Sequence, residues 1–159
     1  MIKPIAYMSI EIIEDPEFGS LTWDTKLAEW NGQSAMTDGT KFGLSVGTPS
    51  ESQPPAEAES NPDKTITAES RIAYRSIRRG DAHIRAKVAD EYVSLYPDWH
   101  DGEHILLEVF QSRLQLDSIR VRASGEVEIF YSDDGMFGGH SLIAFLNPDG
   151  ALDHTELFG

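Results

Sequence analysis

The stretch EIFYSDDGMFGGHSLIAF at positions 128–145 places two acids, three glycines and a histidine between two strand-like segments. Asp133, Asp134 and His140 are residue types that could bind a divalent cation. Calcium would need more oxygen ligands at an ordered spacing, and zinc would need three or four ligands. Asp134-Gly135 is also a hairpin signal, because glycine adopts a positive φ without steric cost. The sequence therefore favours a hairpin turn over a metal site, with the loop as a contact surface.

A metal site elsewhere would require histidines from separate elements to meet. His100 and His104 are four residues apart, a spacing that chelates a metal on a continuous helix. Asp101-Gly102 lies between them and disfavours a helix, so we do not expect the two rings to share a face. A metal-dependent enzyme using His100, His104 and His140 with Asp133, or one that also gathers His154, is the alternative that the sequence leaves open.

Other catalytic chemistries have no matching motif in the chain. There is no G-x-S-x-G elbow for a serine nucleophile, and the absence of cysteine excludes disulfides and thiolate chemistry. The Gly138-Gly139 pair lacks the following helix and lysine of a phosphate-binding loop. The sequence therefore carries no signal of an enzyme, and we predict no catalytic residue, no metal and no cofactor.

The charge of the chain indicates a different kind of ligand. Thirteen basic residues against 27 acidic residues give a net charge of −14. Nucleic-acid binding rests on neutralisation of phosphates by Lys and Arg, so we expect no nucleic-acid ligand. The same charge would steer a basic protein toward this one. The candidate contacts are acids of an N-terminal turn and residues of the C-terminal loop, with an aromatic anchor: Glu14, Asp15, Glu17, Asp133, Asp134 and Phe137.

The length of 159 residues is sufficient for one domain with a hydrophobic core. We therefore expect a single α+β domain over residues 1–159. No stretch approaches the roughly 20 apolar residues of a membrane span. The first residues hold a proline and acids, which fits a strand better than a signal peptide. Together with the absence of cysteine, these features favour a cytoplasmic protein without a membrane partner.

Hydrophobic alternation predicts strands at both ends of the chain. The first fifty residues fit a four-stranded antiparallel meander, in which Asn31-Gly32 is a strong turn signal. Residues 48–63, TPSESQPPAEAESNPD, hold four prolines and almost nothing to bury. They indicate a flexible loop rich in Pro, Ser and Glu. Residues 115–159 again alternate, which predicts a second antiparallel meander packed with the first.

The middle of the chain changes to a helical period. A first helix can be capped by Asp63 or Thr65, and a second helix is expected to end at Pro97. A third, short helix is expected to be capped near Asp101. The predicted fold is therefore an N-terminal meander, central helices and a C-terminal meander.

The C-terminal part resembles a group of bacterial domains of unknown function. In these domains a short helix leads to a strand, an acidic strand and a turn with the pattern DDG-aromatic-x-GH. The opening DPEFGSLTWDTKLAEWNG also resembles theirs, in which D-P-x-F-G-x-L begins a hairpin. The matching residues of the C-terminal part are Leu116, Ile119, Gly125, Tyr131, Asp133, Asp134, Gly135, Phe137, Gly139 and His140.

The resemblance implies no activity and no catalytic residues. Members of this broad class are similar to immunity proteins found beside bacterial toxin genes, so the resemblance implies a protein partner. An acidic surface would suit a basic toxin. We therefore expect an acidic protein-binding domain and, in its finer form, an immunity protein that neutralises a cognate toxin by occluding it.

Overall fold

A computed structural model describes residues 10–52 and 62–159 of the chain. Eight strands form one mixed sheet, in which the order of the strands follows the sequence. This confirms the predicted α+β class, with strands, central helices and strands along the chain. The strands are β1 Ile12–Asp15, β2 Gly19–Asp24, β3 Glu29–Ala35, β4 Lys41–Gly47, β5 Gln115–Val121, β6 Val127–Ser132, β7 Ser141–Leu146 and β8 Leu152–Phe158.

Both predicted meanders are present, and a parallel strand pair joins them. Neighbours are antiparallel within β1–β4 and within β5–β8. Strands β4 and β5 run parallel, with Leu44 opposite Ile119 and Val46 opposite Val121. A parallel pair needs a long crossover connection, and the central helices lie in that crossover.

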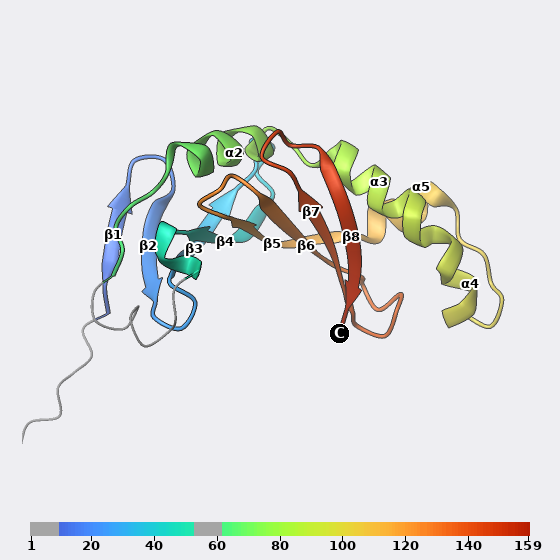
Figure 1. Cartoon of the computed structure of the whole chain (residues 1–159). Coiled ribbons are helices and arrows are strands. Elements are labelled where there is room, and N and C mark those ends of the chain that lie inside the picture. Colours follow the sequence, from blue (N-terminus) through green and yellow to red (C-terminus); the bar gives the residue numbers. More distant parts are fainter. Residues whose placement is uncertain (1–9, 53–61) are drawn as a thin grey trace, which may run out of the picture.

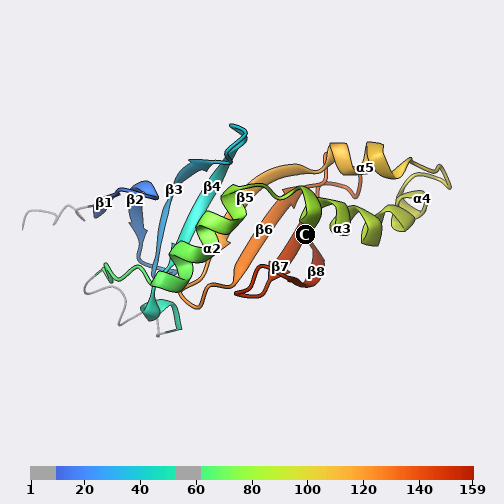
Figure 2. The same ribbon diagram turned by 90° about the horizontal axis from the view of Figure 1, so that it is seen from above.

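The helices cover one face of the sheet. In Figures 1 and 2, α2 and α3 lie on one side of the arched sheet, whereas the short η1 lies on the other side. No helix in the described ranges is long and apolar enough to cross a membrane. The helical segments are η1 Pro49–Ser52, α2 Ala68–Arg78, α3 Ala82–Tyr92, η2 Val93–Leu95, α4 Tyr96–Trp99 and α5 Leu107–Arg113.

The helix boundaries differ from the prediction in three places. Thr67, rather than Asp63 or Thr65, caps α2, and its hydroxyl accepts the N–H of Ser70. Pro97 does not end a helix but lies in the first turn of α4, where its missing N–H costs nothing. The short helix α5 begins after Leu106, because residue 101 occupies a left-handed turn with φ 52°.

The turn predicted at Asn31-Gly32 is wrong, because both residues lie inside β3. A side chain at Gly32 would come within 2.7 Å of the backbone oxygen of Ser20 and 2.8 Å of the Leu21 side chain. Glycine is therefore required there for close packing against β2, and not for a reversal of the chain.

The predicted loop at 48–63 is only partly described. Its first residues form η1, Pro49–Ser52, and residues 53–61 lie outside the described residues. The end of the predicted loop is held to β3 and to η1. The Trp30 indole donates to the backbone oxygen of Asp63 at 2.8 Å, and the Ser50 hydroxyl donates to the Asp63 carboxylate at 2.7 Å.

The core lies between the sheet and the helices. The alternating apolar residues of the strands point toward α2 and α3, as in Phe42, Leu44 and Val46 of β4, which are all buried. A polar contact fixes the junction: the buried Tyr131 hydroxyl donates to the Asp81 carboxylate at 2.7 Å, immediately before α3. Burial raises the pKa of Tyr131 well above its usual range, so the hydroxyl keeps its proton and remains a donor.

Candidate functional site

The N-terminal acidic turn is largely neutralised by the protein's own arginines. Asp15 accepts two backbone N–H bonds of its turn and pairs with Arg71 of α2 at 2.7 Å. Glu17 pairs with both Arg71 and Arg75. The hydrogen bond from Arg71 is the main cause that lowers the pKa of Asp15 to about 2, and the bond from Arg75 is the main cause that lowers the pKa of Glu17. Of the three acids predicted as contacts here, Glu14 is the one that is exposed.

Asp133 forms the centre of the C-terminal loop. The residue is 1% exposed. Its carboxylate accepts four hydrogen bonds of 2.9 to 3.2 Å, from the backbone N–H groups of Gly135, Phe137, Gly139 and His140. The loop connects the antiparallel strands β6 and β7, which confirms the hairpin. These four bonds fix the backbone of the loop, and the carboxylate that makes them is buried.

The other two predicted loop contacts face in opposite directions. Phe137 is 0% exposed and packs against Phe110 and Trp99, with ring centroids 5.8 Å and 5.9 Å away. This corrects the expectation of an exposed aromatic anchor at Phe137, because the loop turns that ring into the core. Asp134 is exposed and pairs with Arg113 of α5 at 3.0 Å. The loop thus holds α4 and α5 against the end of the sheet.

The histidines of the alternative metal site do not converge. His100 Nε2 lies 2.7 Å from the backbone oxygen of Met136, and His140 Nδ1 contacts the backbone oxygen of Phe137. His154 lies on β8, and His104 is an exposed residue before α5. Within residues 10–52 and 62–159, no group of three or more His, Asp or Glu could hold a metal ion. The described residues therefore provide no site for the metal-dependent alternative.

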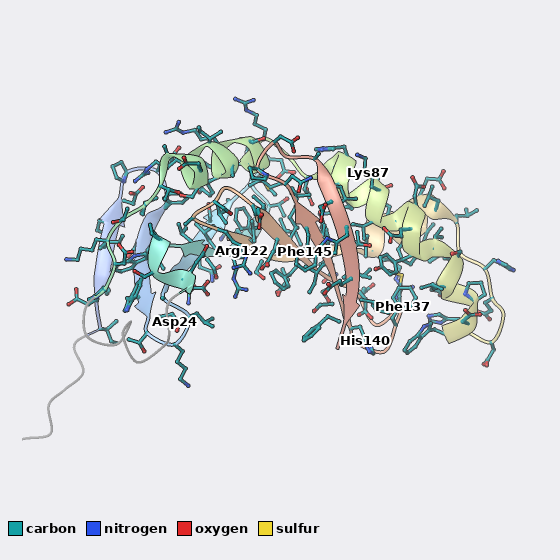
Figure 3. All side chains as sticks on the ribbon, viewed as in Figure 1. Asp24, Lys87, Arg122, Phe137, His140 and Phe145 are labelled. Carbon is teal, nitrogen blue, oxygen red and sulfur yellow. The ribbon has the colours of Figure 1, made fainter. Side chains whose placement is uncertain are left out.

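A cluster of ion pairs lies on the face of the sheet that α2 and α3 leave uncovered. Arg120 reaches Glu29 at 3.2 Å and Glu128 at 3.3 Å, and Arg122 reaches Glu128 at 2.7 Å. Burial raises the pKa of Glu29 despite the nearby guanidinium of Arg120. Figure 3 shows Arg122 and Phe145 on this face, below the arch of the sheet. The arginines of this cluster are thus paired with the protein's own glutamates.

A different segment is acidic, and its acids have no salt-bridge partner among the described residues. From Val88 to Ser112 the sequence holds six acids and no lysine or arginine. None of these acids forms a salt bridge within the described part of the chain. The segment comprises the C-terminal half of α3, then η2 and α4, and nearly all of α5. It lies at the end of the molecule far from β1 (Figures 1 and 2).

The same segment also exposes large apolar side chains. Trp99 is 48% exposed and Leu106 is 70% exposed. Trp23 and Trp30 are buried in the core, whereas Trp99 is not. We define the acidic helical surface as these acids and apolar residues: Asp90, Glu91, Asp98, Asp101, Glu103, Glu108, Leu95, Trp99, Leu106, Leu107 and Val109.

Sequence reasoning missed the acidic helical surface, although a signal was available. Charge counted over residues 64–100 is slightly positive, because the basic residues up to Lys87 outweigh the acids that follow. A count restarted after Lys87 would have isolated the acidic segment. The fold adds information that no charge count contains: Arg71 and Arg75 are paired with acids of β1 and the turn that follows it.

The comparisons with known proteins identify a family. A family model described as "Uncharacterized protein conserved in bacteria (DUF2262)" matches residues 15–157. The match spans both ends that resemble bacterial domains of unknown function, together with the helices between them. No curated protein and no solved structure matches the chain.

Proposed function

Since the chain belongs to the bacterial DUF2262 family, we propose from its own surface that it is a protein-binding domain that takes a basic partner on the acidic helical surface. In its finer form, the proposal is an immunity protein that neutralises a cognate toxin by covering it. The observation that carries the proposal is a segment without lysine or arginine that combines six acids with exposed apolar residues. None of these acids forms a salt bridge with another described residue.

Charge supplies the first step of the proposed binding. Elsewhere in the molecule, several acids are paired with arginines, as Asp15 is with Arg71 and Asp134 is with Arg113. The acids of the acidic helical surface have no arginine partner in residues 10–52 and 62–159, so their negative potential extends into solvent. Such a potential accelerates the encounter with a basic protein. Salt weakens this attraction, because at about 0.1 M ionic strength charges more than about 10 Å apart are largely screened from each other.

Apolar anchors supply the second step. Tryptophan is enriched among the residues that dominate interface energies. Trp99 is held on one side by Phe137 and His140, with ring centroids 5.9 Å and 5.5 Å away, while the rest of its ring is exposed. A side chain that is already fixed loses little conformational entropy when it binds. Leu106 extends the apolar area at the beginning of α5.

Two of the contacts predicted from the sequence remain exposed acids, and they lie apart. Asp134 pairs with Arg113 of α5 and borders the acidic helical surface. Glu14 lies on β1, near the opposite end of the molecule in Figure 1. The proposal therefore places the partner over α4 and α5 with Asp134 at its edge, and Glu14 outside the contact.

Occlusion is the mechanism that we propose for an immunity protein with this surface. A partner seated on the acidic helical surface would have its basic residues covered by carboxylates and an apolar patch. Binding of this kind requires neither a cofactor nor a chemical step in this chain. We place the complex in the cytoplasm, without nucleic acid or membrane.

Co-expression with the product of each neighbouring gene tests the proposal. We expect one basic neighbour to co-purify in stoichiometric amount, and its toxicity to the host to be relieved by this chain. Trp99→Ala should weaken the complex about tenfold or more. Leu27→Ala, which truncates an exposed residue between β2 and β3, serves as the control and should not weaken it. Failure of every neighbour to co-purify, with no toxicity to relieve, would refute the proposal.

A further inference from the structure

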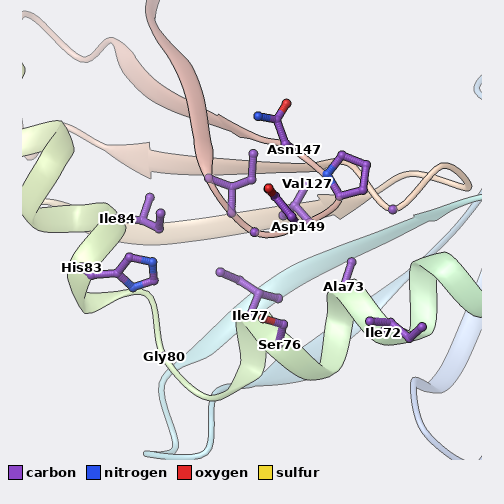
Figure 4. Close-up of a pocket in the computed structure, with 14 residues that line it drawn as sticks. Ile72, Ala73, Ser76, Ile77, Gly80, His83, Ile84, Val127, Asn147 and Asp149 are labelled. Carbon is purple, nitrogen blue, oxygen red and sulfur yellow. The ribbon is translucent and has the colours of Figure 1, made fainter.

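A cavity of about 210 Å³ lies on the helix side of the sheet, at the junction between α2 and α3 (Figure 4). Its lining comes from both helices, from the turn between β5 and β6 and from the turn between β7 and β8. None of its lining residues belongs to the acidic helical surface. The walls are mainly apolar and are formed by Ile72, Ala73, Ile77, Ile84, Val127 and Leu146.

The backbone builds this cavity by bringing two tight turns close to α2. Gly125 and Gly150 both have a positive φ, at 91° and 87°. A side chain at Gly125 would lie 3.3 Å from the backbone oxygen of Glu69 and 3.5 Å from Pro148. The turns can therefore approach the helix only because glycine occupies this position. Gly80 separates α2 from α3 and also lines the space between them.

Polar groups occur at the edge of the cavity rather than in its walls. Ser76, His83, Asn147 and Asp149 belong to the lining. In Figure 4 the side chains of His83 and Asp149 border the space around Ile77. The Oδ1 atom of Asp149 accepts the N–H of Ala151 at 2.9 Å, so Oδ2 remains to interact with a ligand. The lining contains no lysine or arginine.

We propose that this cavity binds a small apolar primary amine. Its volume exceeds the roughly 150 Å³ of an apolar cavity that holds benzene, so it has room for a ring or a branched chain of about six to eight carbon atoms. The Asp149 carboxylate at the edge pairs with the ammonium group, and His83 and Ser76 provide further polar neighbours. An anionic ligand of the same size would face that carboxylate without a compensating cation.

A titration with three ligands that share one ring tests the assignment. Benzylamine, benzyl alcohol and benzoate are added to the full-length protein, and amide and methyl resonances are followed by NMR. We expect benzylamine to bind with a dissociation constant on the order of 1 mM and to shift the resonances of Ile77, Ile84 and Val127. Benzyl alcohol should bind roughly fivefold more weakly, because it lacks the charge that pairs with Asp149, and one partly exposed charge pair contributes about this much to affinity. Benzoate should bind more weakly still.

Two pairs of variants locate the binding. Asp149→Asn keeps an oxygen for the turn but removes the charge, so the affinity for benzylamine should fall about fivefold. Asp117→Asn, at an exposed residue of β5, should leave the affinity unchanged. Ser76→Phe places a ring in the cavity and should abolish the shifts, whereas Ser112→Phe on α5 should not. The proposal is overturned if no ligand shifts the cavity residues, if benzyl alcohol binds as well as benzylamine, or if Asp149→Asn has no effect.

Discussion

Asp133→Asn is expected to lower the free energy of unfolding by about 2 to 3 kcal/mol, whereas Asp134→Asn should change it by less than about 1 kcal/mol. The two substitutions are chemically identical and lie one residue apart. They differ in what the carboxylate does. Asp133 Oδ2 accepts three backbone N–H groups and its Oδ1 accepts one more, in a buried loop.

An asparagine at position 133 cannot replace this arrangement. Its amide offers one acceptor oxygen, and its NH₂ group would face a backbone donor, which leaves a buried polar group unsatisfied. Asp134 lies on the surface, where its pairing with Arg113 is exposed to water, and asparagine tolerates the φ of 50° found there.

Urea unfolding of the two variants at pH 7 measures the difference. Because the loop holds α4 and α5, Asp133→Asn should also accelerate hydrogen exchange in those two helices. Equal stability of the two variants would contradict the prediction, because it would mean that the buried hydrogen bonds of Asp133 stabilise the protein no more than the exposed carboxylate of Asp134 does.

Arg71→Met is expected to destabilise the protein by about 2 to 3 kcal/mol at pH 7. Arg71 links α2 to the turn after β1 through both Asp15 and Glu17. The Asp15 side chain is 8% exposed, so loss of Arg71 leaves a nearly buried carboxylate without its cation. Arg79→Met, at the end of the same helix, removes a charge on an exposed residue and should cost less than about 0.5 kcal/mol.

The pH dependence of this effect follows from the lowered pKa of Asp15. The folded protein holds that pKa at about 2, against 3.8 for the ordinary side chain. A carboxyl group whose pKa is lowered by folding stabilises the protein above its unfolded pKa and loses that contribution as the pH falls toward the folded pKa. The difference between wild type and Arg71→Met should therefore be complete above about pH 5 and shrink between pH 4 and pH 2.

Urea unfolding of both proteins over this pH range measures the change. A destabilisation by Arg71→Met that stays constant down to pH 2 would mean that the arginine acts through packing, for example over the Phe18 ring, and not through the charge of Asp15.

Strands such as β2 and β4 were predictable because each of them buries one face. In β4, Phe42, Leu44 and Val46 alternate with small or polar residues, and the period of two marks the strand directly. The Asn31-Gly32 prediction failed because the same glycine that allows a tight turn also allows close packing of strands. The parallel joining of β4 and β5 depends on a crossover of more than sixty residues, which local patterns do not specify.

The candidate site was predictable only where its chemistry is local. The hairpin at Asp134-Gly135 depends on adjacent residues and was found. The loss of Asp15 as a contact depends on Arg71, 56 positions away, and no spacing rule connects them. The burial of Phe137 also depends on distant partners, because a residue in a turn has no alternating pattern that indicates which way its side chain points.

The affinity for the partner captured by co-expression, measured by calorimetry at low salt, tests the acidic helical surface most directly. Four exposed acids of that surface, Asp90, Glu91, Glu103 and Glu108, are replaced by their amides. The matched control replaces four exposed acids elsewhere, Glu11, Asp38, Asp117 and Glu126, and so carries the same net charge. We expect the first variant to bind roughly 30-fold more weakly, at about 0.5 kcal/mol per charge, and the control to bind nearly as well as wild type. An equal loss in both variants, or no loss in either, would contradict binding at this surface.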